Sequence, residues 1–114
     1  MPGITSTYAK ACDNFSATKD SATGLLNFSY DLYYDWNPGN NSWTGYEQIS
    51  YWITPSLISM KLVIDANTGL TSLFELSWGN NQASFAYQEY WDKGNDVTLD
   101  PSALYGLIIF ALAQ

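Results

Sequence analysis

The chain contains no histidine and no arginine, and its one cysteine is Cys12. Without histidine it lacks the side chain that most often serves as a general base or as an imidazole ligand for metals. Four lysines cannot form the basic cluster that binding to a phosphate backbone requires, so we expect no nucleic-acid partner. A lone cysteine excludes an internal disulfide and a multi-cysteine zinc site. We therefore expect no metal and no other cofactor.

Charged residues are also scarce, at 13% of the chain against about a quarter in average domains, and the net charge is −7. The surface must then be polar mainly through Ser, Thr, Asn and Gln, which is typical of secreted or cell-surface β-proteins. The opening segment "MPGITSTYAKACDNF" lacks the charged-then-apolar layout of a secretory signal. We expect an extracellular protein without a recognisable signal peptide. No apolar run reaches membrane-spanning length, and we expect no membrane insertion.

At 114 residues the chain has the size of one domain, and its first part has a helical pattern. Over residues 4–16 the apolar side chains recur at spacings of four, four and three, which predicts one face of a short helix. The residues of this face are Ile4, Tyr8, Cys12 and Phe15. A helix this short must dock on its own domain or on a second chain. We expect residues 1–24 to form a helix and linker that serve as a dimerisation segment, and a monomer with the helix folded back stays an alternative.

From residue 26 the period changes to two, which predicts a half-buried strand from Leu26 to Trp36. The segment "NPGNNSWTG" at 37–45 is rich in turn residues, so we expect a loop that carries Trp43. Further strands are expected at "YEQISYWIT", "LISMKLVID", "LTSLFELSW" and "ASFAYQEYW", with "GNNQ" as the hairpin turn between the last two. The final "ALYGLIIFALA" is apolar on both faces, as in a buried central strand. Residues 25–114 are thus predicted to form a mainly β, antiparallel β-sandwich.

Aromatic rings mixed with asparagines are typical of carbohydrate sites, because a sugar ring stacks on Trp or Tyr while amides and carboxylates bind its hydroxyls. One candidate site consists of Trp36, Asn37, Asn40, Asn41, Trp43 and Tyr46. A second consists of Trp78, Asn80, Asn81, Tyr90, Trp91 and Asp92. The alternative is that these rings belong to the core and that the asparagines only form turns.

Acidic residues on predicted strands leave an enzymatic alternative open. Glycoside hydrolases place two carboxylates across a cleft, and Glu47 could act with Glu75 or Glu89. A glutamate on a strand more often faces solvent or pairs across strands, so we expect a non-enzymatic protein. A purely structural interaction domain is the third alternative.

The chain resembles the fungal immunomodulatory proteins of the Fve and Ling Zhi type. The matching segments are "FSY" at 28–30 shortly before Trp36, the Asn-Pro-Gly loop, "NTGLTSLFELSWG" at 67–79 and "QEYWDKG" at 88–94. The resemblance implies an immunoglobulin- or fibronectin III-like sandwich preceded by a short N-terminal helix. It also implies secretion, a homodimer built by exchange of the N-terminal helix and strand, and stimulation of immune cells with lectin-like sugar binding. We therefore expect a dimeric protein that binds cell-surface glycans or glycoprotein receptors.

Overall fold

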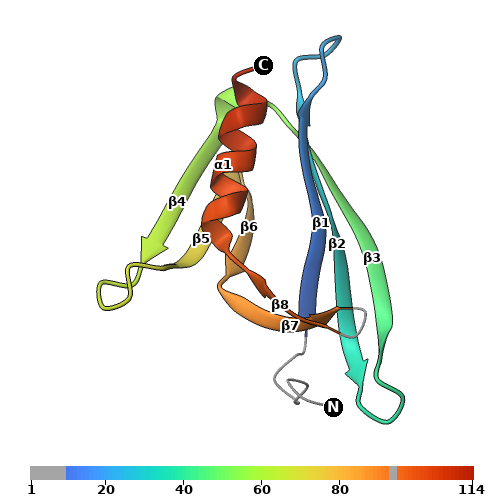
Figure 1. Cartoon of the computed structure of the whole chain (residues 1–114). Coiled ribbons are helices and arrows are strands. Elements are labelled where there is room, and N and C mark those ends of the chain that lie inside the picture. The colour runs from blue at the N-terminus through green and yellow to red at the C-terminus, as the bar shows by residue number, and fades with distance from the viewer. Residues whose placement is uncertain (1–9, 93–94) are drawn as a thin grey trace.

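A computed structural model describes residues 10–92 and 95–114 of the chain. It is mainly β, with two three-stranded antiparallel sheets, a two-stranded hairpin and a C-terminal helix (Figure 1). The first sheet has the order β1-β2-β3 and consists of β1 (Lys10–Lys19), β2 (Leu26–Asn37) and β3 (Ser42–Ile53). The second has the order β4-β5-β6 and consists of β4 (Ile58–Ile64), β5 (Thr71–Trp78) and β6 (Asn81–Ala86). Each sheet is a meander, so neighbouring strands follow one another in the sequence.

Short connections explain this local topology. Asp20 accepts hydrogen bonds from the backbone and side chain of Thr23, which closes the turn between β1 and β2. Gly79 has a φ of 58° at the first position of the two-residue turn between β5 and β6, a position that suits glycine. The 3-10 helix η1 (Pro55–Leu57) connects the two sheets.

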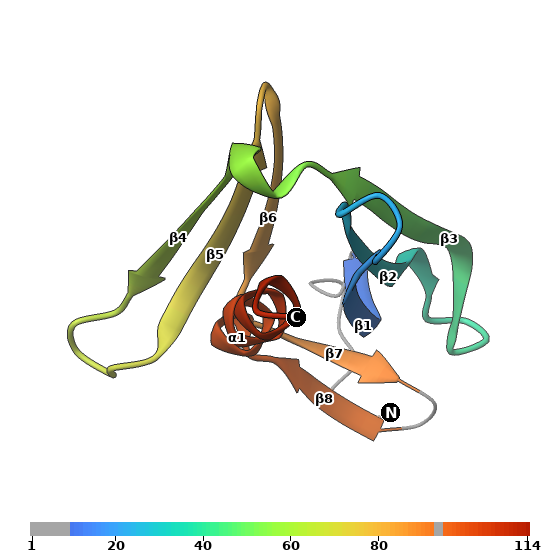
Figure 2. The same cartoon turned by 90° about the horizontal axis from the view of Figure 1, so that it is seen from above.

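The third side of the molecule consists of the hairpin of β7 (Gln88–Asp92) and β8 (Asn95–Leu99) and of helix α1 (Pro101–Leu112). Seen from above, the two sheets diverge from the η1 connection, and α1 and the hairpin lie across the open side between them (Figure 2). The Phe85 ring on β6 contacts the rings of Phe28 and Tyr30 on β2, at centroid distances of 5.9 and 5.2 Å. Buried side chains of α1, including Leu104 and Ile108, complete this core.

Residues 10–16, which were predicted to continue an N-terminal helix, are instead part of β1. The helix prediction is wrong there because a β-bulge imitates the helical spacing. Asp13 pairs with Asp31 and Ser16 with Ser29, so two β1 residues lie opposite the single residue Tyr30. The extra residue lets Cys12 and Phe15, three positions apart, both turn toward the interior. Residues 4–9 of the predicted helix lie outside the described residues.

The C-terminal strand prediction is also wrong, because residues 101–112 form α1. An apolar run without polar alternation does not distinguish a buried strand from a buried helix. The deciding signals are at the start of the segment. The Asp100 side chain accepts a hydrogen bond from the backbone N–H of Ser102, and Pro101 occupies the first turn.

Two boundaries differ from the expected ones. The loop predicted at 37–45 is a turn at 38–41 only, so Trp43 lies on β3 and pairs with Trp36. The strand predicted at 83–91 is interrupted at Tyr87, whose N–H donates to the carbonyl of Ser72 on β5. The remaining strand and turn predictions between residues 26 and 78 are confirmed. Within the described part of the chain, no helix has the length and apolarity needed to cross a bilayer.

Candidate functional site: the aromatic end of the β2–β3 hairpin

Four aromatic rings form a continuous series where β2 and β3 approach their connecting turn. Trp36 meets Trp43 edge to face at a centroid distance of 5.1 Å. Trp43 lies 6.4 Å from Tyr33, and Tyr33 lies 5.2 Å from its cross-strand partner Tyr46. We call Trp36, Trp43, Tyr33 and Tyr46 the aromatic row. Its outermost member is Tyr46, whose side chain is 55% exposed, whereas the other three are half-buried.

A carboxylate lies beside the exposed end of the aromatic row. Asp31 Oδ1 accepts a hydrogen bond from the Tyr46 hydroxyl at 2.8 Å, and its Oδ2 accepts one from Asn14 Nδ2 at 2.8 Å. The hydrogen bond to Asp31 raises the pKa of the Tyr46 phenol. Tyr46 therefore stays protonated at neutral pH. Its ring is held beside a fixed acidic acceptor and an amide donor.

The turn that carries the end of the row is organised by asparagine side chains. Asn37 Oδ1 accepts from the backbone N–H of Gly39 at 2.9 Å, and Asn40 Oδ1 accepts from the Ser42 hydroxyl at 2.8 Å. These bonds use the amide oxygens. Among the described residues these two side chains accept through their oxygens and have no hydrogen bond from their NH₂ groups.

Backbone strain concentrates in this region. Among the described residues, positive φ angles at non-glycine positions occur at Asn14 (53°), Asp35 (56°) and Asn41 (52°). Asn14 lies in the β1 bulge next to Asp31, and the other two flank the β2–β3 turn. Asn and Asp tolerate the left-handed region better than other residues with a Cβ atom, at a cost of order 1–3 kcal/mol each in sparsely populated regions. Such strain gathers at sites where geometry serves a purpose beyond folding.

Trp36 shows a second unusual feature. Its Nε1 is buried and has no hydrogen-bond partner in the described part of the chain. A buried donor left unpaired costs about 1–3 kcal/mol, so native proteins rarely keep one without a reason. The indole thus occupies its place at the end of the row despite an energetic cost.

The structure brings together most of the first predicted sugar site. Trp36, Trp43 and Tyr46 share the aromatic row, and Asn37, Asn40 and Asn41 lie on the turn beside it. Sequence analysis missed Tyr33, Asp31 and Asn14. The alternation along β2 already placed Tyr33 and Asp31 on the face opposite Tyr30, and only the register with β3 adds that Tyr46 lies beside them.

The residues of the second predicted sugar site lie on separate elements of the fold. Trp78 packs on Tyr51 of β3 at a centroid distance of 4.8 Å and is a contact between the two sheets. Asn80 and Asn81 lie at the turn before β6, and Tyr90, Trp91 and Asp92 lie in β7, which follows the other end of β6. A six-residue strand spans about 17–20 Å, so the two groups are well separated. The side chains of Tyr90, Trp91 and Asp92 lie outside the described residues.

Of the two carboxylate pairs in the enzymatic alternative, Glu47 with Glu75 is not brought together. Glu47 lies on β3 of the first sheet. Glu75 lies on β5 between Phe74 and Leu76, which are both fully buried in the core between the sheets. Because successive strand residues point to opposite faces, Glu75 points away from the first sheet. The side chain of Glu89 lies outside the described residues.

The two described residues of the predicted dimer face, Cys12 and Phe15, lie inside their own chain instead of on a dimer surface. Phe15 packs on Tyr30 and Phe85 at 5.3 and 5.6 Å, so it belongs to the core of its own chain. Cys12 is half-buried and lines a cavity that is partly open to solvent. Ile4 and Tyr8 lie outside the described residues. In the part of the chain that the structure describes, no cluster of three or more acidic or cysteine side chains could hold a metal ion.

No protein-family model, curated protein or solved structure matches this chain. The resemblance to the fungal immunomodulatory proteins therefore stays a prediction.

Proposed function

We propose that this protein is a non-enzymatic, lectin-like protein and that it binds cell-surface glycans or glycoproteins through the aromatic row. The observation that carries the proposal is the exposed Tyr46 ring beside Asp31 and Asn14. A pyranose stacks its C–H face on such a ring, and the carboxylate and amide are suited to its hydroxyl groups. The turn amides of Asn37 and Asn40 add donors at the other end of the row.

The direct test of this proposal is a glycan array probed with the full-length protein. We expect saturable binding to a restricted set of sugars that free monosaccharide or oligosaccharide inhibits. An array without any signal above background, obtained with folded protein, would remove the lectin function. The family resemblance also implies immunomodulatory activity, which is tested separately by the release of cytokines from blood cells. Secretion by fungal cells tests the extracellular localisation. We also propose that the two sheets belong to the immunoglobulin- or fibronectin III-like class.

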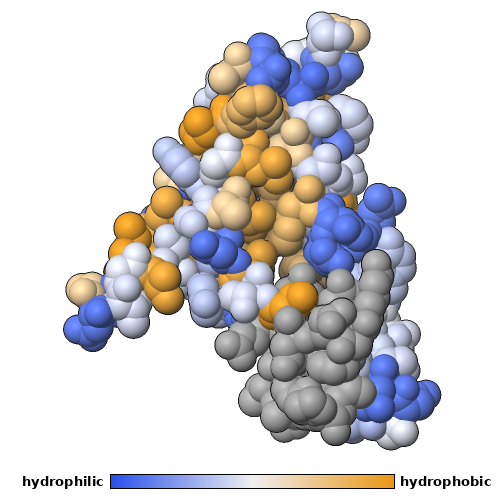
Figure 3. All heavy atoms as spheres, in the orientation of Figure 1, coloured by the Kyte–Doolittle hydropathy of each residue, from blue (hydrophilic) through white to orange (hydrophobic). Residues whose placement is uncertain are grey.

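We also propose a homodimer, through a surface other than the one the sequence suggested. Helix α1 contains no charged residue, and its outer face exposes Tyr105, Ile109 and Phe110, the last at 70%. Figure 3 shows hydrophobic residues gathered along α1. A helix that is apolar all round is normally covered on every side. The chain carries a net charge of −7, so an uncharged face is where two copies can meet without like-charge repulsion.

A further inference from the structure

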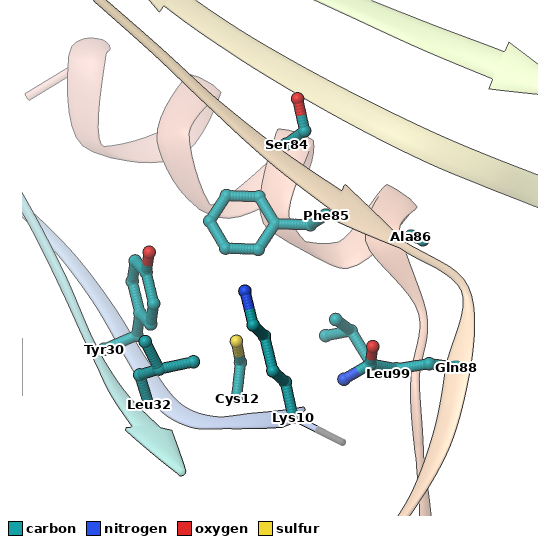
Figure 4. A pocket seen from close by; sticks show the side chains of 9 residues that line it. All are labelled: Lys10, Cys12, Tyr30, Leu32, Ser84, Phe85, Ala86, Gln88 and Leu99. Atoms are coloured by element: carbon teal, nitrogen blue, oxygen red, sulfur yellow. The ribbon is translucent and has the colours of Figure 1, made fainter. Parts of the chain in front are cut away.

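A cavity that is partly open to solvent lies where the two sheets meet the β7–β8 hairpin. It has a volume of about 200 Å³. Its walls come from four parts of the fold, which are β1, β2, β6 and the hairpin. The lining residues, shown in Figure 4, are Lys10, Cys12, Tyr30, Leu32, Ser84, Phe85, Ala86, Gln88 and Leu99.

The size and walls of this cavity suit one aromatic ring with a short substituent. An enclosed apolar cavity of roughly 150 Å³ is known to accept benzene, and this cavity has comparable room although it is partly open to solvent. Here Phe85, Tyr30 and Leu99 are each more than nine-tenths buried and supply aromatic and aliphatic surface. Ring-on-ring contact with Phe85 or Tyr30 would add about 0.5–1.5 kcal/mol beyond the buried area.

Among the described residues, the lining of the cavity carries a positive charge and no negative charge. Lys10 is the one charged side chain among the described residues of the lining, and Figure 4 shows its Nζ end directed toward the Phe85 ring. Among the described residues no carboxylate pairs with it, although the chain has 11 acidic residues and four lysines. A lysine usually extends its ammonium group to water or to an acid.

The neighbouring groups do not neutralise this ammonium. Burial raises the pKa of the Cys12 thiol to about 11, with Lys10 lowering it by a smaller amount. Burial also raises the pKa of the Tyr30 phenol, helped by the hydroxyl of Tyr51. Both groups are therefore neutral at physiological pH. The carboxamide of Gln88 on β7 is directed into the same cavity and carries a hydrogen-bond donor (Figure 4).

We propose that this cavity binds a small aromatic carboxylate, with the ring packed against Phe85 and the carboxylate on Lys10 Nζ. The Gln88 amide donates the second hydrogen bond to the acid. None of the described residues that line this cavity belongs to the aromatic row.

The test uses phenylacetate as the probe and its uncharged analogue phenylacetamide as the ligand control, by isothermal titration calorimetry on the full chain. Lys10 begins β1 and is exposed, so Lys10→Met and Lys10→Arg are expected to keep the fold. Phenylacetate should bind the wild type and Lys10→Arg, and its affinity should fall at least about ten-fold in Lys10→Met. Phenylacetamide should bind all three proteins equally and weakly. Equal affinity of phenylacetate for wild type and Lys10→Met, or no saturable binding to the wild type, would overturn the proposal.

The reactivity of the single cysteine gives a second measurement of binding that is independent of calorimetry. Cys12 lines the cavity, so a bound ligand should block its reaction with an aromatic disulfide reagent. We expect phenylacetate to slow this reaction several-fold in the wild type and to leave the rate in Lys10→Met unchanged. Equal protection in both proteins would place phenylacetate outside the Lys10 site and contradict the assignment.

Discussion

Gly45 shows at the residue scale how the site constrains the sequence. A Cβ atom at this position would lie 2.2 Å from the ring of Tyr34, its partner on β2. The ring can occupy that space only because Gly45 has no side chain. The Tyr34–Gly45 pair lies between the two cross-strand pairs of the aromatic row, Tyr33–Tyr46 and Trp36–Trp43.

Gly45→Ala should destabilise the protein by about 1–3 kcal/mol, because Tyr34 must leave its place or the strands must separate. The matched control is Gly106→Ala on α1, where no heavy atom lies within 4 Å of the added Cβ. There alanine should stabilise by up to about 1 kcal/mol, as it does inside helices generally. Urea unfolding of both variants measures the difference, and a neutral Gly45→Ala would show that Tyr34 is free to move.

The Cys12 thiol gives a pH-dependent prediction. Its pKa is raised from 9.0 to about 11 by burial, so the folded chain holds the proton more tightly than the unfolded chain. The contribution to the free energy of unfolding is complete below about pH 9 and is lost as the pH rises through about 11. Unfolding of the wild type and of Cys12→Ala between these values isolates the effect. The wild type should lose more stability than the variant, and parallel curves would contradict the burial of the thiol.

Among the secondary-structure elements, those that show strict polar–apolar alternation or are joined by short turns could be predicted from the sequence. The strand from Leu26 to Trp36 and the hairpin turn at Gly79 follow from local pattern alone. The β1 strand could not be recognised, because the bulge at Asn14 brings Cys12 and Phe15 to one side and imitates a helix. The aromatic row was only partly predictable. Its tryptophans were visible in the sequence, but the contact of Tyr33 with Tyr46 depends on the register.

A strand was predicted where helix α1 forms, because this segment is apolar on every side. The N-terminal cap is the feature that distinguishes the helix from a strand. Asp100→Ala should lower the free energy of unfolding by about 0.5–2 kcal/mol, because Asp100 Oδ1 no longer accepts from the N–H and hydroxyl of Ser102. Asp100→Asn is the control, since an asparagine oxygen also caps. Thermal unfolding followed by circular dichroism measures both, and an equal loss in the two variants would point to charge rather than to capping.

For the molecule as a whole, we expect two copies to associate through the outer face of α1. Light scattering of the wild type should give about twice the 12.7 kDa of one chain. Phe110→Glu should give a monomer, because it places a charge in the centre of an uncharged interface. Ile64→Glu is the matched control on β4, where the side chain is similarly exposed at 59%. A monomeric wild type, or a dimer that survives Phe110→Glu and dissociates with Ile64→Glu, would move or remove the interface.

Sugar binding by the aromatic row is tested by comparing two exposed rings on the same strand. The best glycan from the array is titrated against the wild type, Tyr46→Ala and Trp52→Ala. Both residues lie on β3 with exposed rings, at 55% and 60%, but only Tyr46 belongs to the row. The account predicts that Tyr46→Ala binds about ten-fold more weakly or not at all, while Trp52→Ala binds like the wild type. Unchanged affinity in Tyr46→Ala, or loss only in Trp52→Ala, would contradict it.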